Sequence, residues 1–418
     1  MLDPRIEPPG RGPIARLPSL GLVRTNRDLR VDLARGIALW FIFVDHVPGN
    51  VLGDFTLRNA ALCDATEAFV LLAGYAAGLA YGRQMDREGW LAAAAKVLGR
   101  VFTLYVAHVF LFVVFTAQVG YSAAALDSMV YLDELHLDAF GEQPYRALLE
   151  ALLLRFQPAF LNILPLYVVI LALFAAALPL LRRPGWLLAG SALLYAYVRV
   201  RGVNLPSWTG GGWFFNPLAW QLLFALGATM GYAPPGGAVR RLRWSRPLGL
   251  ACGLVLLASF AGVLVIYHHR EWLDVLPLRL AALVDATDKT ALHPFRLLSI
   301  LAITYLVAHA VPKEAGWLRG PVAAPLVLMG QQGLPVFCAG IFLAFLGRLA
   351  IELSEDWPMQ AAVNAAGLAA LVLVGAVTAW NGGKPRPPRA APLPAPSPVP
   401  SPAASPGPLP GAALPDTA

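Results

Sequence analysis

Apolar segments long enough to cross a membrane recur along the whole chain. A helix needs about 20 mainly apolar residues to span the hydrocarbon core of a bilayer. The 418 residues are 57% hydrophobic and 14% charged, whereas ordinary soluble domains carry about 25% charged residues. The sequence therefore predicts an all-α polytopic integral membrane protein, with about ten transmembrane helices in one bundle. The expected spans are 31–50, 64–82, 97–119, 159–181, 186–200, 216–232, 247–267, 296–311, 322–349 and 359–380.

The basic residues are distributed unevenly between the two sides of these segments. If the N-terminus is cytoplasmic, 21 of the 32 lysines and arginines fall on the cytoplasmic side, 10 fall outside and Arg35 lies within a span. An excess of Lys and Arg is typical of cytoplasmic loops, so the pattern predicts that both termini are cytoplasmic. The net charge of +7 is then a consequence of topology, and we expect no nucleic-acid partner.

Composition divides the chain into three regions. Residues 1–30 form a basic segment that we expect in the cytoplasm, and residues 31–381 form the transmembrane domain. Residues 382–418 are rich in Pro, Ala and Ser, and they are predicted to be disordered because they cannot bury a core. The loops expected to form an outer vestibule are 120–158, 201–215 and 268–295. The cysteines, predicted to be buried thiols, are Cys63, Cys252 and Cys338.

The first span carries the strongest functional signal. Arg35 and His46 are eleven positions apart, so on an α-helix they share a face and lie roughly 16 Å apart along the axis. Ionisable groups within a membrane helix are costly and usually mark function. The alternative is an Asp32–Arg35 clamp with a histidine that is bonded to a neighbouring helix. Asp45 points about 100° away from His46 around the helix, so it is not the obvious group to orient the imidazole.

The second span begins with two carboxylates. Asp64 and Glu67 share a helix face at a depth similar to that of His46, so Glu67 is a candidate to hold one imidazole nitrogen and make the other more basic. The alternative is a helix N-cap, which Asp64 suits well. The chain has no zinc pattern, Gly-rich phosphate loop or nucleophile elbow, and we predict neither a metal nor a permanently bound cofactor.

Weaker candidates for substrate or donor binding lie elsewhere in the apolar segments and loops. Asn162 and Gln221 have amides that can donate hydrogen bonds within the bundle, although contacts between helices are the commoner role of such residues. Trp208 and Trp213 can stack on sugar rings or belong to an interfacial aromatic belt. Asp45 and Asp32 of the first span complete this set. The sequence Gly330-Gln-Gln-Gly-Leu-Pro335 is expected to break the ninth segment beside a cavity.

Several segments are similar to those of a known family. Residues 27–50, which read RDLRVDLARGIALWFIFVDHVPGN, resemble the opening of the OpgC family, as do 55–59 and 64–83. Segments 160–167 and 333–337 also look like family segments, although Gly330-Gln-Gln-Gly333 departs from the usual Gly-Arg/Gln-His/Asn-Ser. OpgC proteins belong to the membrane acyltransferases of the acyltransferase 3 type, whose hallmark is Arg, ten residues and His. Arg35 and His46 match that spacing.

The resemblance, which covers roughly 27–380, implies an activity and a location. It implies O-acyl transfer, with an acyl group such as succinyl moving from cytoplasmic acyl-CoA (succinyl-CoA or acetyl-CoA) to a hydroxyl of a periplasmic glucan or other envelope glycan. The location would be the bacterial inner membrane, among membrane lipid. His46 would be the general base, Glu67 its orienter, and Arg35 would bind donor phosphate or polarise the thioester. The alternatives are a transporter or flippase for a glycan or lipid-linked sugar, and a scaffold.

Overall fold

The computed structural model describes residues 27–235, 242–275, 277–278, 281 and 286–383. The chain divides into two units, Met1–Gly382 and Gly383–Ala418. Most of the basic N-terminal segment and nearly all of the predicted disordered tail lie outside the described residues, as do parts of the loops near 240 and 280. Within the described residues the chain consists of helices and loops, with one isolated bridge between Pro206 and Gly212.

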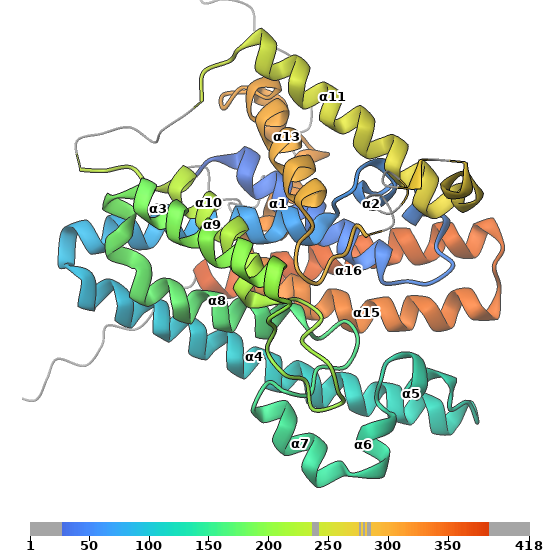
Figure 1. Cartoon of the computed structure of the whole chain (residues 1–418). Coiled ribbons are helices and arrows are strands. Elements are labelled where there is room, and N and C mark those ends of the chain that lie inside the picture. The colour runs from blue at the N-terminus through green and yellow to red at the C-terminus, as the bar shows by residue number, and fades with distance from the viewer. Residues whose placement is uncertain (1–26, 236–241, 276, 279–280, 282–285, 384–418) are drawn as a thin grey trace, which may run out of the picture. The chain divides into compact units, whose positions relative to one another are not determined.

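Each of the ten predicted spans is mostly helical in the structure (Figure 1). The long helices are α1 (Leu29–Asp45), α3 (Ala65–Glu88), α4 (Trp90–Ala125), α8 (Ile163–Ala177), α9 (Pro184–Arg201), α10 (Pro217–Gly231), α11 (Arg246–Val263), α13 (Pro294–Ala310), α14 (Ala323–Gln331), α15 (Gly333–Leu353) and α16 (Trp357–Gly383). The short helices are η1 (Val51–Phe55), α2 (Leu57–Ala60), α5 (Val130–Glu134), α6 (Asp138–Glu142), α7 (Pro144–Leu152), η2 (Leu178–Arg182), η3 (Leu264–His268), η4 (Arg270–Asp274) and η5 (Gly316–Arg319).

Among the described residues, five helical stretches are long and apolar enough to cross a membrane. They are Trp90–Ala125, Ile163–Arg182, Arg246–His268, Gly333–Leu353 and Trp357–Gly382. The all-helical membrane class is therefore supported, whereas the count of about ten spans stays a prediction. Some of the other helices are simply short, since α1 and α13 have 17 residues each and α10 has 15.

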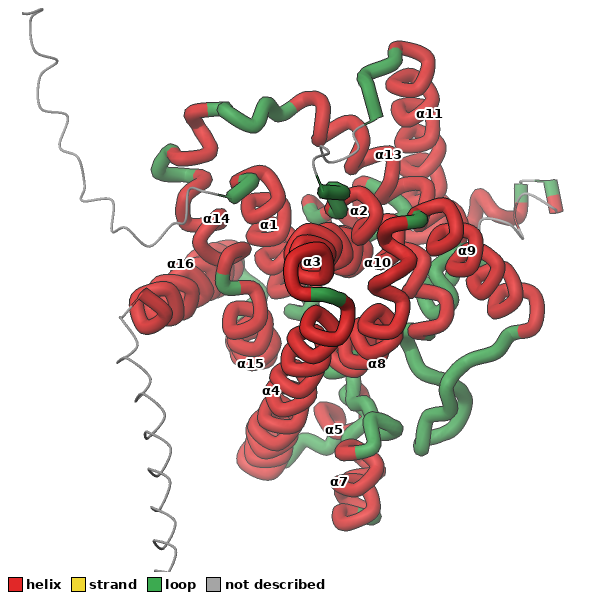
Figure 2. Tube along the Cα trace, turned by 90° about the vertical axis from the view of Figure 1, so that its left-hand side faces the viewer, coloured by secondary structure: helices red, strands yellow, loops and turns green. Residues whose placement is uncertain are grey.

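The close approach of α3 and α10 depends on glycine. A Cβ on Gly74 or Gly78 would collide with a backbone carbonyl of α10, and a Cβ on Gly227 or Gly231 would collide with a carbonyl of α3. Small residues spaced by four let membrane helices approach until their backbones touch. Figure 2 shows α3 between α1 and α10, so this glycine-lined pair forms the interior against which α1 packs.

The predicted break in the ninth segment is present, and it separates α14 from α15 at Gln332. Pro335 has no backbone N–H to donate to the Gln331 carbonyl, and its ring crowds that carbonyl, so a continuous helix is disfavoured there. α14 packs closely on α1, because a Cβ on Gly330 would collide with the Asp32 carbonyl and one on Gly36 with a carbonyl of α14. The break therefore places the end of α14 beside the Arg35 turn of α1.

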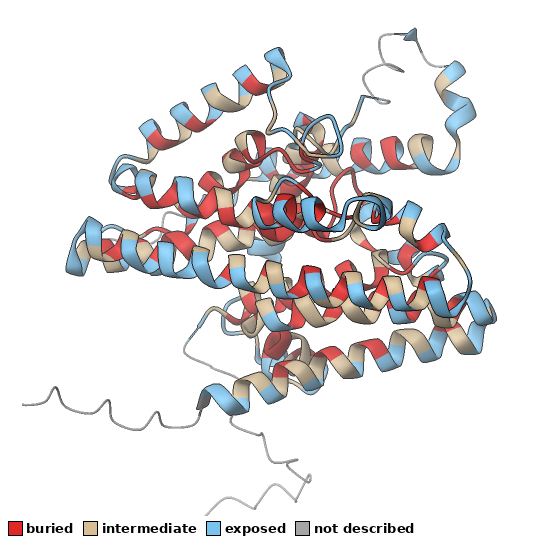
Figure 3. Ribbon diagram, turned by 90° about the horizontal axis from the view of Figure 1, so that it is seen from below, coloured by how far each residue is buried: buried red, intermediate tan, exposed pale blue. Residues whose placement is uncertain are grey.

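Buried and exposed residues alternate along the long helices (Figure 3). On α4 the exposed apolar side chains recur at helical spacing, as expected for a helix that faces lipid. They are Leu91, Leu98, Phe102, Val106, Phe110 and Val113. The cysteine thiols are free, with Cys63 and Cys252 buried and Cys338 partly buried, which agrees with the predicted thiols.

Candidate functional site

Arg35 lies where α1, α3 and α14 meet. Its guanidinium donates from Nη1 to the Gly330 carbonyl oxygen and from Nη2 to the Leu72 carbonyl oxygen, each at 3.3 Å. The nearest carboxylate oxygen, Oδ1 of Asp32, is 3.6 Å from Nη1. Two of the three contacts are therefore with neutral carbonyls, so the positive charge of Arg35 is only partly offset.

The buried carboxylate of Asp32 is shared among several groups. Arg27 approaches its Oδ1 to 3.2 Å, and the Gln331 side chain donates to its Oδ2 at 3.0 Å. The alternative interpretation of Asp32 as a clamp for Arg35 is thus only part of its role. Asp32 joins the start of α1 to the end of α14 and holds Arg35 from one side.

A cavity of about 300 Å³ opens beside Arg35, and we call it the Arg35 cavity. Six helices line this cavity, namely α1, α3, α4, α8, α14 and α15. The lining residues include Arg35, Phe69, Tyr81, Arg100, Tyr167, Gln331 and Phe337. No hydrogen bond or ion pair engages Arg100 within the described part of the chain. Two guanidiniums on one cavity suit a phosphate or another anionic group, because guanidinium donors match phosphate oxygens in geometry and charge.

His46 caps the C-terminal end of α1, at the far end of the helix from the Arg35 turn. Its Nδ1 donates to the Ile42 carbonyl oxygen at 2.6 Å, which places the lone pair of a neutral imidazole on Nε2. The Phe160 ring packs edge-on against the imidazole, with 4.5 Å between ring centroids. Phe160 has a φ of 71°, a backbone conformation that costs a non-glycine residue about 1–3 kcal/mol and that is enriched at functional sites.

A second cavity, of about 340 Å³, opens beside His46. This His46 cavity is lined by residues from all three loops predicted to form a vestibule. The loop 120–158 provides His136 and Gln157, and the loop 201–215 provides Phe214 and Phe215. The loop 268–295 provides Lys289. The predicted meeting of the three loops is therefore confirmed, and it brings aromatic rings and hydrogen-bonding side chains around the imidazole.

A third hollow, of about 460 Å³, adjoins the His46 cavity and shares Asp45 and Arg58 with it. Asp45 accepts a hydrogen bond from the Thr56 hydroxyl at 2.6 Å. Arg58 is exposed, and no ion pair or hydrogen bond engages its guanidinium within the residues the structure describes. Carboxylate, guanidinium and backbone groups line this hollow, which gives a polar approach to His46.

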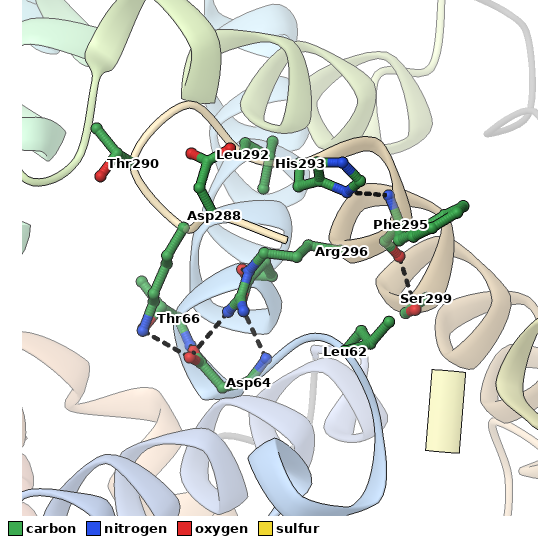
Figure 4. A network of polar contacts seen from close by, with 12 residues as sticks. Leu62, Asp64, Thr66, Asp288, Thr290, Leu292, His293, Phe295, Arg296 and Ser299 are labelled. Carbon is green, nitrogen blue, oxygen red and sulfur yellow. Dashed lines mark hydrogen bonds and ion pairs between the residues drawn. The ribbon is translucent and has the colours of Figure 1, made fainter. Parts of the chain in front are cut away.

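Glu67 lies in a different place from the one expected. It is fully buried, with Oε2 accepting from the Asp64 backbone N–H at 2.9 Å and Oε1 accepting from Nε of Arg296 at 2.6 Å. Arg296 reaches from α13 to Asp64 as well, at 3.1 Å (Figure 4). The expected contact between Glu67 and His46 is absent from the hydrogen bonds of the described residues, because α13 supplies a cation that engages Glu67. The Ile42 carbonyl orients the imidazole instead.

The start of α13 is held by a second polar cluster (Figure 4). The Ser299 hydroxyl lies 2.8 Å from that of Ser259 on α11, which in turn accepts from the Leu62 N–H at 2.5 Å. His293 caps α13 by accepting from the Phe295 N–H at 3.3 Å. Burial lowers the pKa of His293, which favours the neutral ring that this acceptor role requires.

The weaker candidates are divided between the cavities and the packing. Asn162 lines the His46 cavity. Gln221 donates to the Ser191 carbonyl oxygen at 2.9 Å, so it links α10 to α9. Trp208 lies under the Arg146 guanidinium, 5.5 Å from its ring centroid. Trp213 is buried, and its Nε1 has no hydrogen-bond partner among the described residues.

Four cations near the site were not singled out from the sequence. Arg58 and Lys289 line the His46 cavity, and Arg100 lines the Arg35 cavity. Arg296 pairs with Asp64, which lines the His46 cavity. Arg296 could have been recognised, because it lies within the expected span 296–311 and the reasoning applied to Arg35 applies to it equally. Arg58 stands in a family-like segment. The same reasoning applies to Arg100, which lies within the expected span 97–119 and within α4. Lys289 gave no such signal, because it belongs to a loop, where basic residues are common.

The fold and the two cavities define a helical membrane protein whose first helix joins a guanidinium-lined cavity to an imidazole-lined one. The chain belongs to the OpgC family, because the model of that family, described as OpgC protein, matches residues 27–382. The resemblance inferred from the sequence is confirmed, and with it the implied class of membrane acyltransferase. The search of curated proteins and the search of solved structures each found no match.

Proposed function

We propose that this protein transfers an acyl group from cytoplasmic acyl-CoA to a hydroxyl of a periplasmic glucan or related envelope glycan. The observation that carries the proposal is that Arg35, in the second turn of α1, and His46, at its C-terminal end, line two cavities that both border Phe337. The donor would bind through its phosphates at the Arg35 cavity. Its pantetheine arm would extend along α1 and deliver the thioester to His46.

The separation of the two residues supports different roles for them. Because eleven residues of helix rise roughly 16 Å, one group cannot contact both Arg35 and His46 unless it is long and thin. Arg35, with Arg100, is therefore assigned to the donor phosphates rather than to the thioester carbonyl. The acceptor glycan would enter through the third hollow, where the Asp45 carboxylate and the Arg58 guanidinium can bond to sugar hydroxyls.

The chemical step needs one base and no covalent enzyme intermediate. Nε2 of His46 takes the proton from the sugar hydroxyl while the hydroxyl oxygen attacks the thioester carbonyl carbon. The C–S bond then breaks, and the imidazolium returns the proton to the leaving CoA thiolate, so that a sugar ester and CoA are formed. The hydrogen bond from Nδ1 to the Ile42 carbonyl keeps the required tautomer.

The test compares His46→Ala with His309→Ala in acyl transfer by the purified protein. Nδ1 of His309 likewise lies 2.7 Å from the carbonyl oxygen four residues earlier, that of Tyr305, and its Nε2 lies 3.0 Å from the Leu242 carbonyl oxygen. His309 lines neither cavity. We expect His46→Ala to lose a factor of about 10²–10⁴ in rate and His309→Ala to retain activity. Mass spectrometry of envelope glycans from cells with and without the chain identifies the product. Normal turnover by folded His46→Ala would exclude the general-base role.

Transport of a glycan or lipid-linked sugar is the second candidate. The break between α14 and α15 favours it, because discontinuous helices are common at carrier binding sites. A carrier has no need to bind acyl-CoA, so calorimetry of the intact protein with succinyl-CoA and acetyl-CoA separates the two candidates. Saturable binding supports the acyltransferase, and its absence supports transport.

A further inference from the structure

One aromatic side chain stands at the boundary between the two cavities. Phe337, in the second turn of α15, lines both the Arg35 cavity and the His46 cavity, and no other described residue lines both. Its side chain is buried, with 4% exposed. Phe337 is therefore the described residue that borders both cavities.

The ring is held by other aromatic residues rather than by a polar contact. Phe337 stacks on Phe69 of α3, with 6.3 Å between centroids and 28° between planes. Phe69 in turn packs against Tyr167 of α8 at 5.9 Å. Three helices thus contribute to one aromatic wall. Because these contacts are apolar, a change in the rotamer of Phe337 would break no hydrogen bond or ion pair of its side chain.

The helix break sets the position of Phe337 relative to Arg35. α15 begins at Gly333, where a Cβ would lie 3.4 Å from Cδ of Arg35. Phe337 is four residues further on, so it lies on the same face of α15 about one turn away. The first turn of α15 therefore borders the Arg35 side chain, and the second turn carries Phe337, which borders both cavities.

We propose that Phe337 is a partition between the donor and acceptor cavities, which the acyl-pantetheine arm displaces when it extends toward His46. This inference rests on the proposed function. The ring keeps water in the His46 cavity away from the donor side until an acyl arm occupies the passage. It also limits the length and bulk of the acyl group that can pass, so Phe337 is a positioning and specificity-determining residue.

The test uses full-length protein with Phe337→Ala and Phe337→Trp, and Phe345→Ala as the matched control. Phe345 is buried on the same helix with 2% exposed, packs against the rings of Phe115 and Tyr131, and lines neither cavity. Acyl-CoA binding, acyl transfer and acceptor-free hydrolysis are measured with acetyl-, succinyl- and longer acyl-CoA. If Phe337→Ala does not fold, Phe337→Leu carries the same measurements.

We expect the smaller side chain to raise acceptor-free hydrolysis several-fold relative to transfer and to extend transfer to longer acyl groups. Phe337→Trp should lose transfer while acyl-CoA binding stays within a few-fold of wild type. Phe345→Ala should lower stability without changing either profile. If wild type transfers acyl groups but the Phe337 variants match Phe345→Ala, the partition alone is refuted. If wild type itself binds no acyl-CoA, the proposed function and the partition are refuted together.

Discussion

The buried cation of α13 offers the most direct test of the structure. Arg296 lies 2.6 Å from a Glu67 oxygen and 3.1 Å from an Asp64 oxygen, and its side chain is only 7% exposed. In Arg296→Met, Asp64 keeps Lys289 at 2.5 Å, whereas Glu67 loses the cation bonded to it. Removing one partner of a buried ion pair costs about 3–5 kcal/mol, because the other charge is left uncompensated. We expect a loss of that order in the free energy of unfolding.

A second substitution tests whether the uncompensated charge is the cause. Glu67→Gln removes the charge but keeps an oxygen that can accept from the Asp64 N–H, so the double variant with Arg296→Met should recover most of the lost stability. Denaturant titration of the purified protein in detergent, followed by tryptophan fluorescence, measures each free energy. Arg58→Met is the control, because it removes an exposed guanidinium without an ion pair in the described residues. An Arg296→Met variant within about 0.5 kcal/mol of wild type, or a double variant no better than the single one, would refute the reasoning.

Three further predictions follow from the packing, the topology and the donor cavity. Gly78→Ala should lower the stability measured by the same titration, because its Cβ collides with the backbone of α10, whereas Gly99→Ala has open space and should be neutral or slightly stabilising; equal stability would contradict the packing. Tyr145→Cys should react with a membrane-impermeant maleimide on intact cells, and Leu242→Cys should react only after lysis. The reverse pattern would contradict the predicted topology and with it the cytoplasmic entry of the donor. Arg35→Ala should weaken acyl-CoA binding in calorimetry, with Arg35→Lys restoring only part of it because Lys lacks the planar fork; unchanged affinity would exclude the donor role.

Local regularities allowed the helical scaffold and the first pair of site residues to be predicted from the sequence. Helical spacing alone placed Arg35 and His46 at two levels of one face, and the structure puts a cavity at each. The combination of Gly330 and Pro335 predicted the break that ends α14. Each of these inferences concerns one short segment of the chain, whose backbone geometry is set by residues close to it in sequence.

Contacts between distant segments were not predictable in the same way. Glu67 and Arg296 are 229 positions apart, and whether they meet depends on how α13 is rotated about its own axis. The hydrogen bond from His46 to the Ile42 carbonyl joins residues four positions apart, so it could have been considered from the sequence. The residue types did not favour this carbonyl over a carboxylate as the partner of the imidazole. Lys289 is placed by contacts with a distant helix, since Nε1 of Trp220 on α10 donates to its carbonyl oxygen at 3.1 Å.

The guanidinium of Arg35 is held in part by a backbone atom of α14, the Gly330 carbonyl oxygen. The Gly330 carbonyl is among the last four of α14, which have no partner within that helix, so it is available to Arg35. Adding or removing one residue anywhere in α14 would turn that carbonyl about 100° around the axis while leaving the charged residues of the site unchanged. For Arg35, the number of residues in α14 therefore matters as well as the identity of Gly330, where a Cβ would collide with the Asp32 carbonyl. Deletions there should thus be far less tolerated than most conservative substitutions.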